Sequence, residues 1–174
     1  MKWMLGLLAV AILVVGGTGC SSIAVDGDHD ASANFAAYKT YAWSKGVEQG
    51  GVVMVSSLDD ARIRRAVDVE MQVKGFIRDD QNPPDLFVTY FASAQDKFAV
   101  YDNRWATPSG WATGDVTVSN YTEGTLIIDL VDAKANHMVW RGSASGAIDP
   151  NSTDKEHQIQ SVVRKIFNLY PPGR

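Results

Sequence analysis

Residues 125–148 read Thr-Leu-Ile-Ile-Asp-Leu-Val-Asp-Ala-Lys-Ala-Asn-His-Met-Val-Trp-Arg-Gly-Ser-Ala-Ser-Gly-Ala-Ile and predict a β-hairpin. Two runs rich in apolar residues flank a polar turn at residues 133–137, as in an antiparallel strand pair. The return strand places Trp140 on one face, together with small residues at every second position: Gly142, Ala144 and Gly146. Because these small side chains leave room above the sheet, we expect a helix to pack closely over this face.

Two amphipathic helices are predicted on either side of the hairpin in the chain. Residues 57–74 carry apolar side chains at helical spacing, with a capping box of Ser57 and Asp60 at the start and Gly75 at the end. A second capping box, Thr153 with Glu156, begins a final helix that stops before residues 171–172, Pro-Pro. The basic residues of the first helix lie mainly off its apolar stripe, which indicates a solvated face or a patch for an anionic partner: Arg62, Arg64 and Arg65.

Further strands are predicted around these elements. Residues 85–94 alternate well, residues 98–101 continue or pair with them, and shorter strands are expected near residues 41–43 and 116–121. Trp43 and Trp140 are expected in the core. This order of elements predicts an α+β fold, an antiparallel β-sheet of about 4–6 strands with two α-helices packed on one face.

Composition and charge exclude several classes of protein. The chain has 174 residues with 16 Lys+Arg and 20 Asp+Glu, a net charge of −4, so it lacks the basic excess that nucleic-acid binding requires. The single cysteine excludes an intramolecular disulfide and a cysteine-based zinc site. We therefore expect no nucleic acid as a partner.

The N-terminus has the pattern of a bacterial secretory signal. Lys2 precedes an uncharged apolar run at residues 3–15, and small residues lead to Cys20. A spanning helix needs about 20 apolar residues, whereas a basic start, a shorter apolar run and a small-residue exit are typical of a signal peptide. Residues 17–20, Gly-Thr-Gly-Cys, resemble the lipobox, whose cysteine becomes the first mature residue and carries diacylglycerol. We predict a signal peptide at residues 1–19 and a lipidated Cys20 that anchors the protein in the membrane.

Two other outcomes stay open for this segment, because Gly17 stands where lipoboxes usually carry leucine. An ordinary signal peptidase would leave a soluble secreted protein with a free thiol, and an uncleaved segment would itself be an anchor. Ser21 after the cysteine resembles lipoproteins sorted to the outer membrane, so we expect the protein on its periplasmic face. Beyond the signal we expect a lipidated N-terminus and tether at residues 20–34, with a short edge strand at 23–25, and a single globular domain at residues 35–174.

Several segments together resemble a known bacterial family. They are Phe-Ala-Ala-Tyr-Lys-Thr-Tyr-Ala-Trp at 35–43, Val-Lys-Gly-Phe at 73–76, Pro-Asp-Leu-Phe-Val-Thr-Tyr at 84–90, Glu-Gly-Thr-Leu-Ile-Ile-Asp-Leu-Val-Asp at 123–132, Val-Trp-Arg-Gly-Ser-Ala-Ser at 139–145 and Tyr-Pro-Pro at 170–172. In order and spacing the chain is similar to the lipoprotein family known as domain of unknown function 4136. The resemblance implies an envelope lipoprotein of Gram-negative bacteria, and it brings no established activity, cofactor or catalytic residue.

The residues themselves predict neither catalysis nor a cofactor or metal. Residues 142–146 have the glycines of a nucleophile elbow, but the central residue is Ala144. Residues 26–30, Asp-Gly-Asp-His-Asp, have the spacing of a calcium loop that then lacks its required Gly and Glu. Asp129 is expected to pair with Arg141 across the hairpin. The histidines are too far apart in the sequence to form a local ligand pair: His29, His137 and His157.

Aromatic residues in the segment 102–122 are the remaining lead for binding. Trp105, Trp111 and Tyr121 fall in a predicted irregular loop, where binding residues often gather, although they could equally cap one end of the sheet. We expect a non-enzymatic envelope lipoprotein that binds another envelope component, with an envelope protein as partner. The alternative is a periplasmic domain that binds a small ligand or glycan through the Trp105–Trp111 loop. A pocket lined by both tryptophans favours the alternative, and a flat apolar face favours the first hypothesis.

Overall fold

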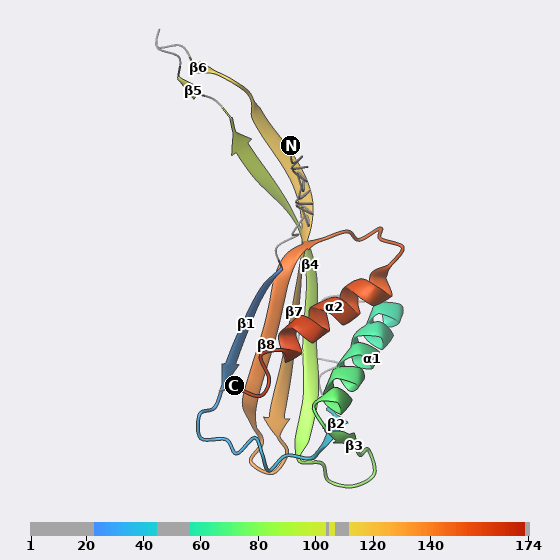
Figure 1. The fold of residues 1–174 in the computed structure, drawn as a ribbon. Helices are drawn as coiled ribbons and strands as arrows, with labels where there is room; N and C mark the ends of the chain where they lie inside the picture. Colours follow the sequence, from blue (N-terminus) through green and yellow to red (C-terminus); the bar gives the residue numbers. More distant parts are fainter. Residues whose placement is uncertain (1–22, 45–55, 104, 107–111, 173–174) are drawn as a thin grey trace, which may run out of the picture.

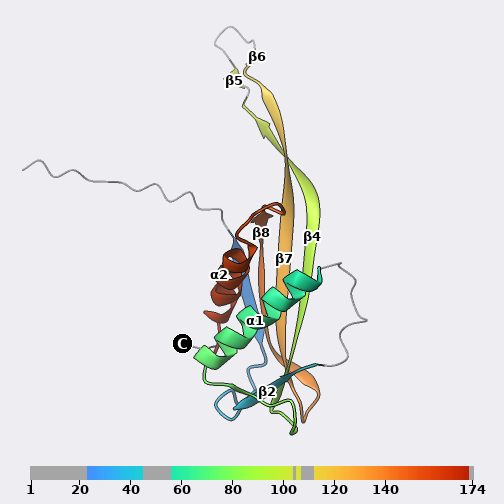
Figure 2. The same cartoon turned by 90° about the vertical axis from the view of Figure 1, so that its right-hand side faces the viewer.

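The computed structural model describes residues 23–44, 56–103, 105–106 and 112–172, with the backbone alone for 105–106 and 112–113. A six-stranded sheet has the strand order β1-β8-β7-β4-β2-β3 (Figure 1). Two helices, α1 (Ser57–Val73) and α2 (Lys155–Phe167), cover one face of this sheet (Figure 2), which confirms the predicted α+β fold. In the order of the sheet, the strands are β1 (Ala24–His29), β8 (His137–Ile148), β7 (Val116–Asp132), β4 (Leu86–Asp102), β2 (Thr40–Trp43) and β3 (Ile77–Arg78).

The prediction of a purely antiparallel sheet is wrong at one edge. β1, β8, β7 and β4 pair antiparallel, but β2 runs parallel to both β4 and β3. The chain leaves β2, passes through α1 and returns to the sheet, and such a helical crossover brings the next strand back in the same direction. Helix α1 was predicted, but the strand before it was not assigned a neighbour.

Asp85 holds the parallel strand β2 beside β4. Its carboxylate accepts hydrogen bonds from the backbone N–H groups of Lys39 (2.7 Å) and Thr40 (2.9 Å). In return, the backbone N–H of Asp85 donates to the hydroxyl of Thr40 at 3.0 Å. The two backbone donors to its carboxylate lower the pKa of Asp85 below its usual value. Tethering β2 therefore depends on the charged form of this side chain.

We expect the stability of the domain to fall as the pH drops below about 4, the ordinary pKa of an aspartate in an unfolded chain. The pKa of Asp85 and the pKa of Asp132 are both lowered in the folded state, mainly by backbone N–H donors. A carboxyl group whose pKa is lowered by folding stabilises the folded state at pH values above its pKa in the unfolded chain. This stabilisation is lost as the pH falls through the pKa of the folded state. Urea unfolding midpoints measured from pH 6 to pH 2 check this, and Asp85→Asn should give a shallower decline. A midpoint independent of pH across this range would contradict the prediction.

Helix α1 begins one residue earlier than the predicted capping box. Ser56 is the N-cap, and its hydroxyl accepts a hydrogen bond from the backbone N–H of Asp59 at 3.1 Å. The predicted pair of Ser57 and Asp60 is thus wrong by one position, because serine and aspartate each occur twice in succession and the sequence fits both registers. The helix ends as predicted at Gly75, whose φ of 90° lies in the left-handed region that favours glycine.

Helix α2 packs closely on β8, as the small residues of that strand predict. A Cβ atom built at Gly142 would lie only 2.4 Å from Ile166 of α2. Trp140 is 1% exposed and its ring contacts those of Phe167 and Tyr170, while Trp43 is also buried, so both predicted core tryptophans are confirmed. The predicted Thr153–Glu156 capping box is wrong, since the N-cap is Asp154 without a side-chain capping bond.

Strand β1 lies within the segment assigned to a tether. The predicted edge strand at 23–25 is present, but it is longer, at Ala24–His29, and pairs along its whole length with β8. Asp26 and Asp28, which have calcium-loop spacing, therefore lie in a strand of the sheet. Strand β1 therefore begins four residues after Cys20, which lies outside the described residues with the rest of the predicted signal.

Candidate binding surface

The most distinctive feature of the fold is a β-hairpin that extends well beyond the helices. β4 and β7 stay paired from Leu86–Asp132 to Asp102–Val116. β8 accompanies β7 only as far as the pair Thr122–Ile148, and β2 accompanies β4 only as far as Val88. We call residues 94–102 and 116–124 the arm, which projects from one end of the sheet (Figure 1). Within the described residues, most of the arm is a two-stranded ribbon without a neighbouring strand or helix.

One side of the arm is apolar and open to solvent. Phe98 is 71% exposed, Val118 is 60% exposed, and Val100 lies directly opposite Val118 on the paired strand. Directly paired residues share a face of a sheet, as do residues two apart along a strand. Four exposed side chains therefore form one continuous surface, which we call the apolar arm face: Phe98, Val100, Val116 and Val118.

This surface continues the core face of the sheet. Counting in steps of two along β7 leads from Val118 to Leu126 and Ile128, which are buried under the helices. The same count along β4 leads from Phe98 back to Val88. The side of the two strands that faces the core thus continues into the arm, beyond the ends of the helices. There, no described part of the chain covers it.

The opposite side of the arm is polar. Lys97 forms an ion pair with Glu123, and Ser119 is exposed on the same face. Tyr121 lies directly opposite Lys97 and is half-buried, so it is on the side away from Phe98. The arm is therefore amphipathic, and Tyr121, a predicted binding residue, belongs to its polar face.

The other predicted binding residues are not brought into a described site. Trp105 belongs to β5 (Trp105–Ala106), which pairs with β6 (Ala112–Thr113) near the tip of the hairpin, and only its backbone is described. Trp111 and the lipidation residue Cys20 lie outside the described residues. Glycan binding by the Trp105–Trp111 loop stays a prediction.

An apolar cavity of about 280 Å³ lies where the arm meets the body of the domain. Its floor is formed by small residues of three strands, and its walls include Ile63 of α1 and Ile159 of α2. Ile23, just before β1, also lines it. The floor residues are Ala92, Ala94, Gly124, Ala144 and Gly146. This cavity and the apolar arm face lie on the same side of the sheet, at the end from which the arm projects.

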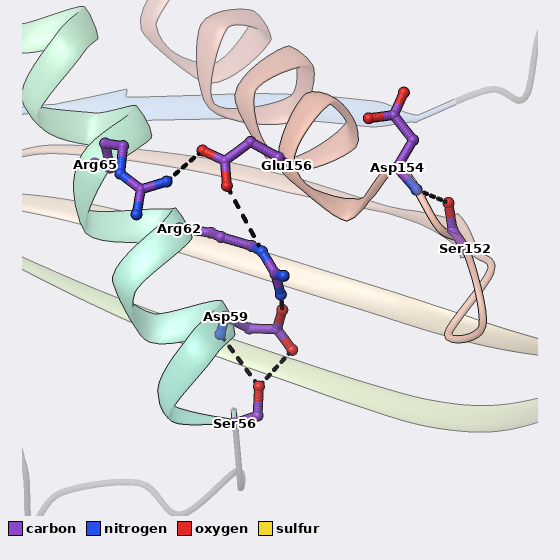
Figure 3. Close-up of polar contacts among 7 residues, drawn as sticks. All are labelled: Ser56, Asp59, Arg62, Arg65, Ser152, Asp154 and Glu156. Carbon is purple, nitrogen blue, oxygen red and sulfur yellow. Dashed lines mark hydrogen bonds and ion pairs between the residues drawn. The ribbon is translucent and has the colours of Figure 1, made fainter.

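Charged residues hold the two helices together beside this cavity (Figure 3). Glu156, in the first turn of α2, accepts a hydrogen bond from Arg65 of α1 at 2.7 Å and forms an ion pair with Arg62 of the same helix at 3.6 Å. Arg62 also contacts Asp59 at 2.6 Å. The third arginine, Arg64, lies 4.7 Å from the ring centre of Trp43. The arginines are thus engaged with residues of the chain itself rather than forming a purely solvated face.

Two further pairs of titratable residues lie on the surface. Arg141 binds Asp129 through two hydrogen bonds of 2.7 Å, which confirms the predicted cross-strand pair. His137 lies 3.1 Å from Asp30. In the described part of the chain, no three His, Cys, Asp or Glu side chains gather to hold a metal ion. Among the described helices, none is both long and apolar enough to cross a membrane.

Comparison with known proteins places the chain in a family. A family model matches residues 25–172, which include every described strand and helix except the first residue of β1. The chain belongs to the DUF4136 family, a domain of unknown function. The match confirms the resemblance inferred from the sequence. No curated protein matches the DUF4136 chain in sequence.

One solved structure shares the fold at low sequence identity. A PDZ domain protein from Parabacteroides distasonis has a TM-score of 0.57 and 13% identity, over 88% of this chain and 36% of that chain. The DUF4136 chain thus spans about a third of that protein. Two structures of a PelC dodecamer from Paraburkholderia phytofirmans have TM-scores of 0.49 and 0.47, with 11% and 13% identity, and cover 84% of this chain and 95% and 96% of theirs. At these identities the first likeness concerns the fold alone.

The apolar arm face was missed by sequence reasoning, although part of its signal was present. Residues 98–101 and 116–121 were each predicted to form or extend strands, and the second segment begins with alternating apolar and polar residues. What the sequence lacked was the register between the two strands. Only the pairing of Val100 with Val118 shows that their side chains lie on one face.

Proposed function

We propose that this protein is a non-enzymatic lipoprotein of the bacterial cell envelope, anchored through Cys20 on the periplasmic face of the outer membrane, whose domain binds a further envelope component. The observation that carries the binding role is the apolar arm face. Five of the exposed large hydrophobic residues lie on the arm, four of them on one side: Phe98, Val100, Val116 and Val118, with Tyr101 on the other. Contiguous exposed apolar surface typically marks an interaction site.

The structure of the arm also supports a binding role. An isolated two-stranded hairpin is at best marginally stable in water and usually needs a third strand or a packed helix. Most of the arm has neither among the described residues, whereas the same strands are well covered nearer the body. A partner that covers the apolar arm face would provide the missing contacts. The uncovered arm therefore favours binding of an envelope component over binding of a small ligand or glycan.

Two features support the lipid anchor. Cys20 follows a signal-like segment in a lipobox-like context, and the sheet begins at Ala24. The family match starts at residue 25, five residues after the proposed anchor. Short spacing of this kind would hold the domain close to the membrane surface.

Replacing Cys20 with alanine, in a chain whose residues 1–19 are exchanged for a signal peptide that an ordinary signal peptidase cleaves, should abolish labelling by a palmitate analogue and release the domain from membranes. Without the sulfur there is no thioether to carry diacylglycerol, and the cleaved chain lacks both the apolar signal segment and the two or more acyl groups that stable anchoring requires. Membrane fractionation after a high-salt wash, together with the mass of the mature chain, measures the outcome. Ser22→Ala serves as the control and should stay lipidated and membrane-bound. Membrane retention of the unlabelled Cys20→Ala protein would contradict the proposed anchor.

A further inference from the structure

We propose that the partner of the apolar arm face is the lipid bilayer itself: the arm lies flat on the membrane that holds the anchor, with Phe98, Val100, Val116 and Val118 in contact with lipid. This inference rests on the proposed lipidation of Cys20. It goes further in naming the surface that the arm contacts and the orientation of the domain on the membrane.

The anchor and the arm lie at the same end of the domain. β1 begins with Ala24 paired to Ser145, and Ser145 is paired in turn to Thr125 of β7, next to the base of the arm. Ile23 lines the cavity that also includes Ala94 and Gly124, the first and last residues of the arm. Cys20 precedes Ile23 by three residues, which reach at most about 10 Å when fully extended. A lipid on Cys20 would therefore hold this end of the sheet within about that distance of the bilayer.

The arm is longer than this short connection. From Ala94 to Asp102 the strand rises by about 3.3 Å per residue, or roughly 26 Å in total. It projects away from the helices, at the end of the sheet where β1 begins (Figure 1). An arm of this length, fixed within about 10 Å of the surface, meets the bilayer unless the whole domain turns away. Lying along the surface satisfies both the anchor and the arm.

The side chains of the arm fit the interface between lipid and water. The apolar arm face is bounded by Asp96 and Asp102, which lie on the same side of β4. The apolar band between them is too short for a strand that spans the hydrocarbon core, which takes about 9–11 residues. Moreover, the backbone N–H and C=O groups along the outer edges of the arm have no strand to pair with. Burying them in hydrocarbon would cost free energy, whereas water and lipid headgroups can form hydrogen bonds with them at the membrane surface. The arm therefore suits shallow contact rather than insertion across the bilayer.

A second copy of the chain or an envelope protein would cover the apolar arm face equally well, but neither is indicated by the position of the anchor.

Site-specific fluorescence on the lipidated protein tests this orientation. The chain has a single cysteine, whose sulfur the lipid occupies, so Val118→Cys introduces a unique free thiol for an environment-sensitive dye. Ser119→Cys is the matched control, because it is the next residue on the same strand and faces the opposite side. The full mature protein is reconstituted in phosphatidylethanolamine–phosphatidylglycerol vesicles that contain no other protein. Lipids brominated on the acyl chains should quench the dye at position 118 several-fold more than the dye at position 119.

The possible outcomes separate the inference from the proposed function. Phe98→Cys provides a second probe on the same face and should behave like Val118→Cys. A blue-shifted dye that brominated lipid does not quench would indicate a second copy of the chain on the apolar arm face and overturn the inference. Equal quenching at positions 118 and 119 would also overturn it. In both cases the proposed anchor still holds if the protein carries the added mass of the lipid and floats with the vesicles. If the protein carries no lipid by mass and does not float, both the anchor and the inference are refuted.

Discussion

Replacing Gly142 with alanine should lower the free energy of unfolding by about 3 kcal/mol, at the upper end of the usual cost of overpacking a core. A Cβ atom at this position would lie 2.4 Å from the side chain of Ile166 and 2.4 Å from the ring of Trp140. Both neighbours are essentially inaccessible to solvent, so neither can turn outward to make room. Since native domains are stable by only about 5–15 kcal/mol, a loss of this size is easily measured by urea unfolding.

Gly124→Ala is the matched control for this prediction. The added methyl group would again meet an isoleucine, Ile148, at 2.8 Å. However, Ile148 is 40% exposed and its side chain can rotate toward solvent. We therefore expect a loss below about 1 kcal/mol, as for substitutions near the surface. Equal destabilisation by Gly142→Ala and Gly124→Ala would show that helix α2 does not pack on β8 as closely as described.

The close packing at Gly142 was predictable because it depends on local pattern. Small residues at alternate positions after Trp140 leave a hollow on one face of the strand, and a helix is the usual element to fill it. The hairpin of β7 and β8 and both helices follow from periodicity in the same way. Which serine caps α1 was not predictable. Ser56 and Ser57 both carry a hydroxyl group, and each is followed three positions later by an aspartate.

Features that depend on contacts distant in sequence were beyond prediction. The parallel placement of β2 requires Asp85 to bind the backbone of Lys39 and Thr40, about 45 positions away in the chain. The apolar arm face requires the register of β4 against β7, because a shift of one residue would move Val100 to the polar side. The length of the arm likewise depends on pairing, because β4 and β7 stay paired beyond the ends of the neighbouring strands. Alternation of apolar and polar residues predicts individual strands, whereas the pairing of strands decides which side chains share a face of the sheet.

Asp68 on helix α1 joins three parts of the fold through its carboxylate. One oxygen accepts hydrogen bonds from the hydroxyl of Tyr41 (2.8 Å) and the indole N–H of Trp43 (3.0 Å), both on β2. The other oxygen binds the guanidinium of Arg78 on β3 at 3.0 Å. Tyr41 is fully buried, and burial together with the bond to Asp68 raises the pKa of its hydroxyl above the usual value. This carboxylate therefore fastens the helix to the parallel edge of the sheet.

Asp68→Ala should lower the free energy of unfolding by about 3 kcal/mol, because it leaves two buried donors unsatisfied at about 1–3 kcal/mol each. Asp80→Ala is the control: Asp80 also binds Arg78, but its side chain is 51% exposed, and surface ion pairs contribute at most about 1 kcal/mol. Urea unfolding of both variants measures the difference. In a double-mutant cycle, Tyr41→Phe should cost less in the Asp68→Ala background than in the wild type, since the orphaned hydroxyl is then removed. Additive costs would mean that Tyr41 and Asp68 stabilise the fold independently, contrary to the shared hydrogen bond.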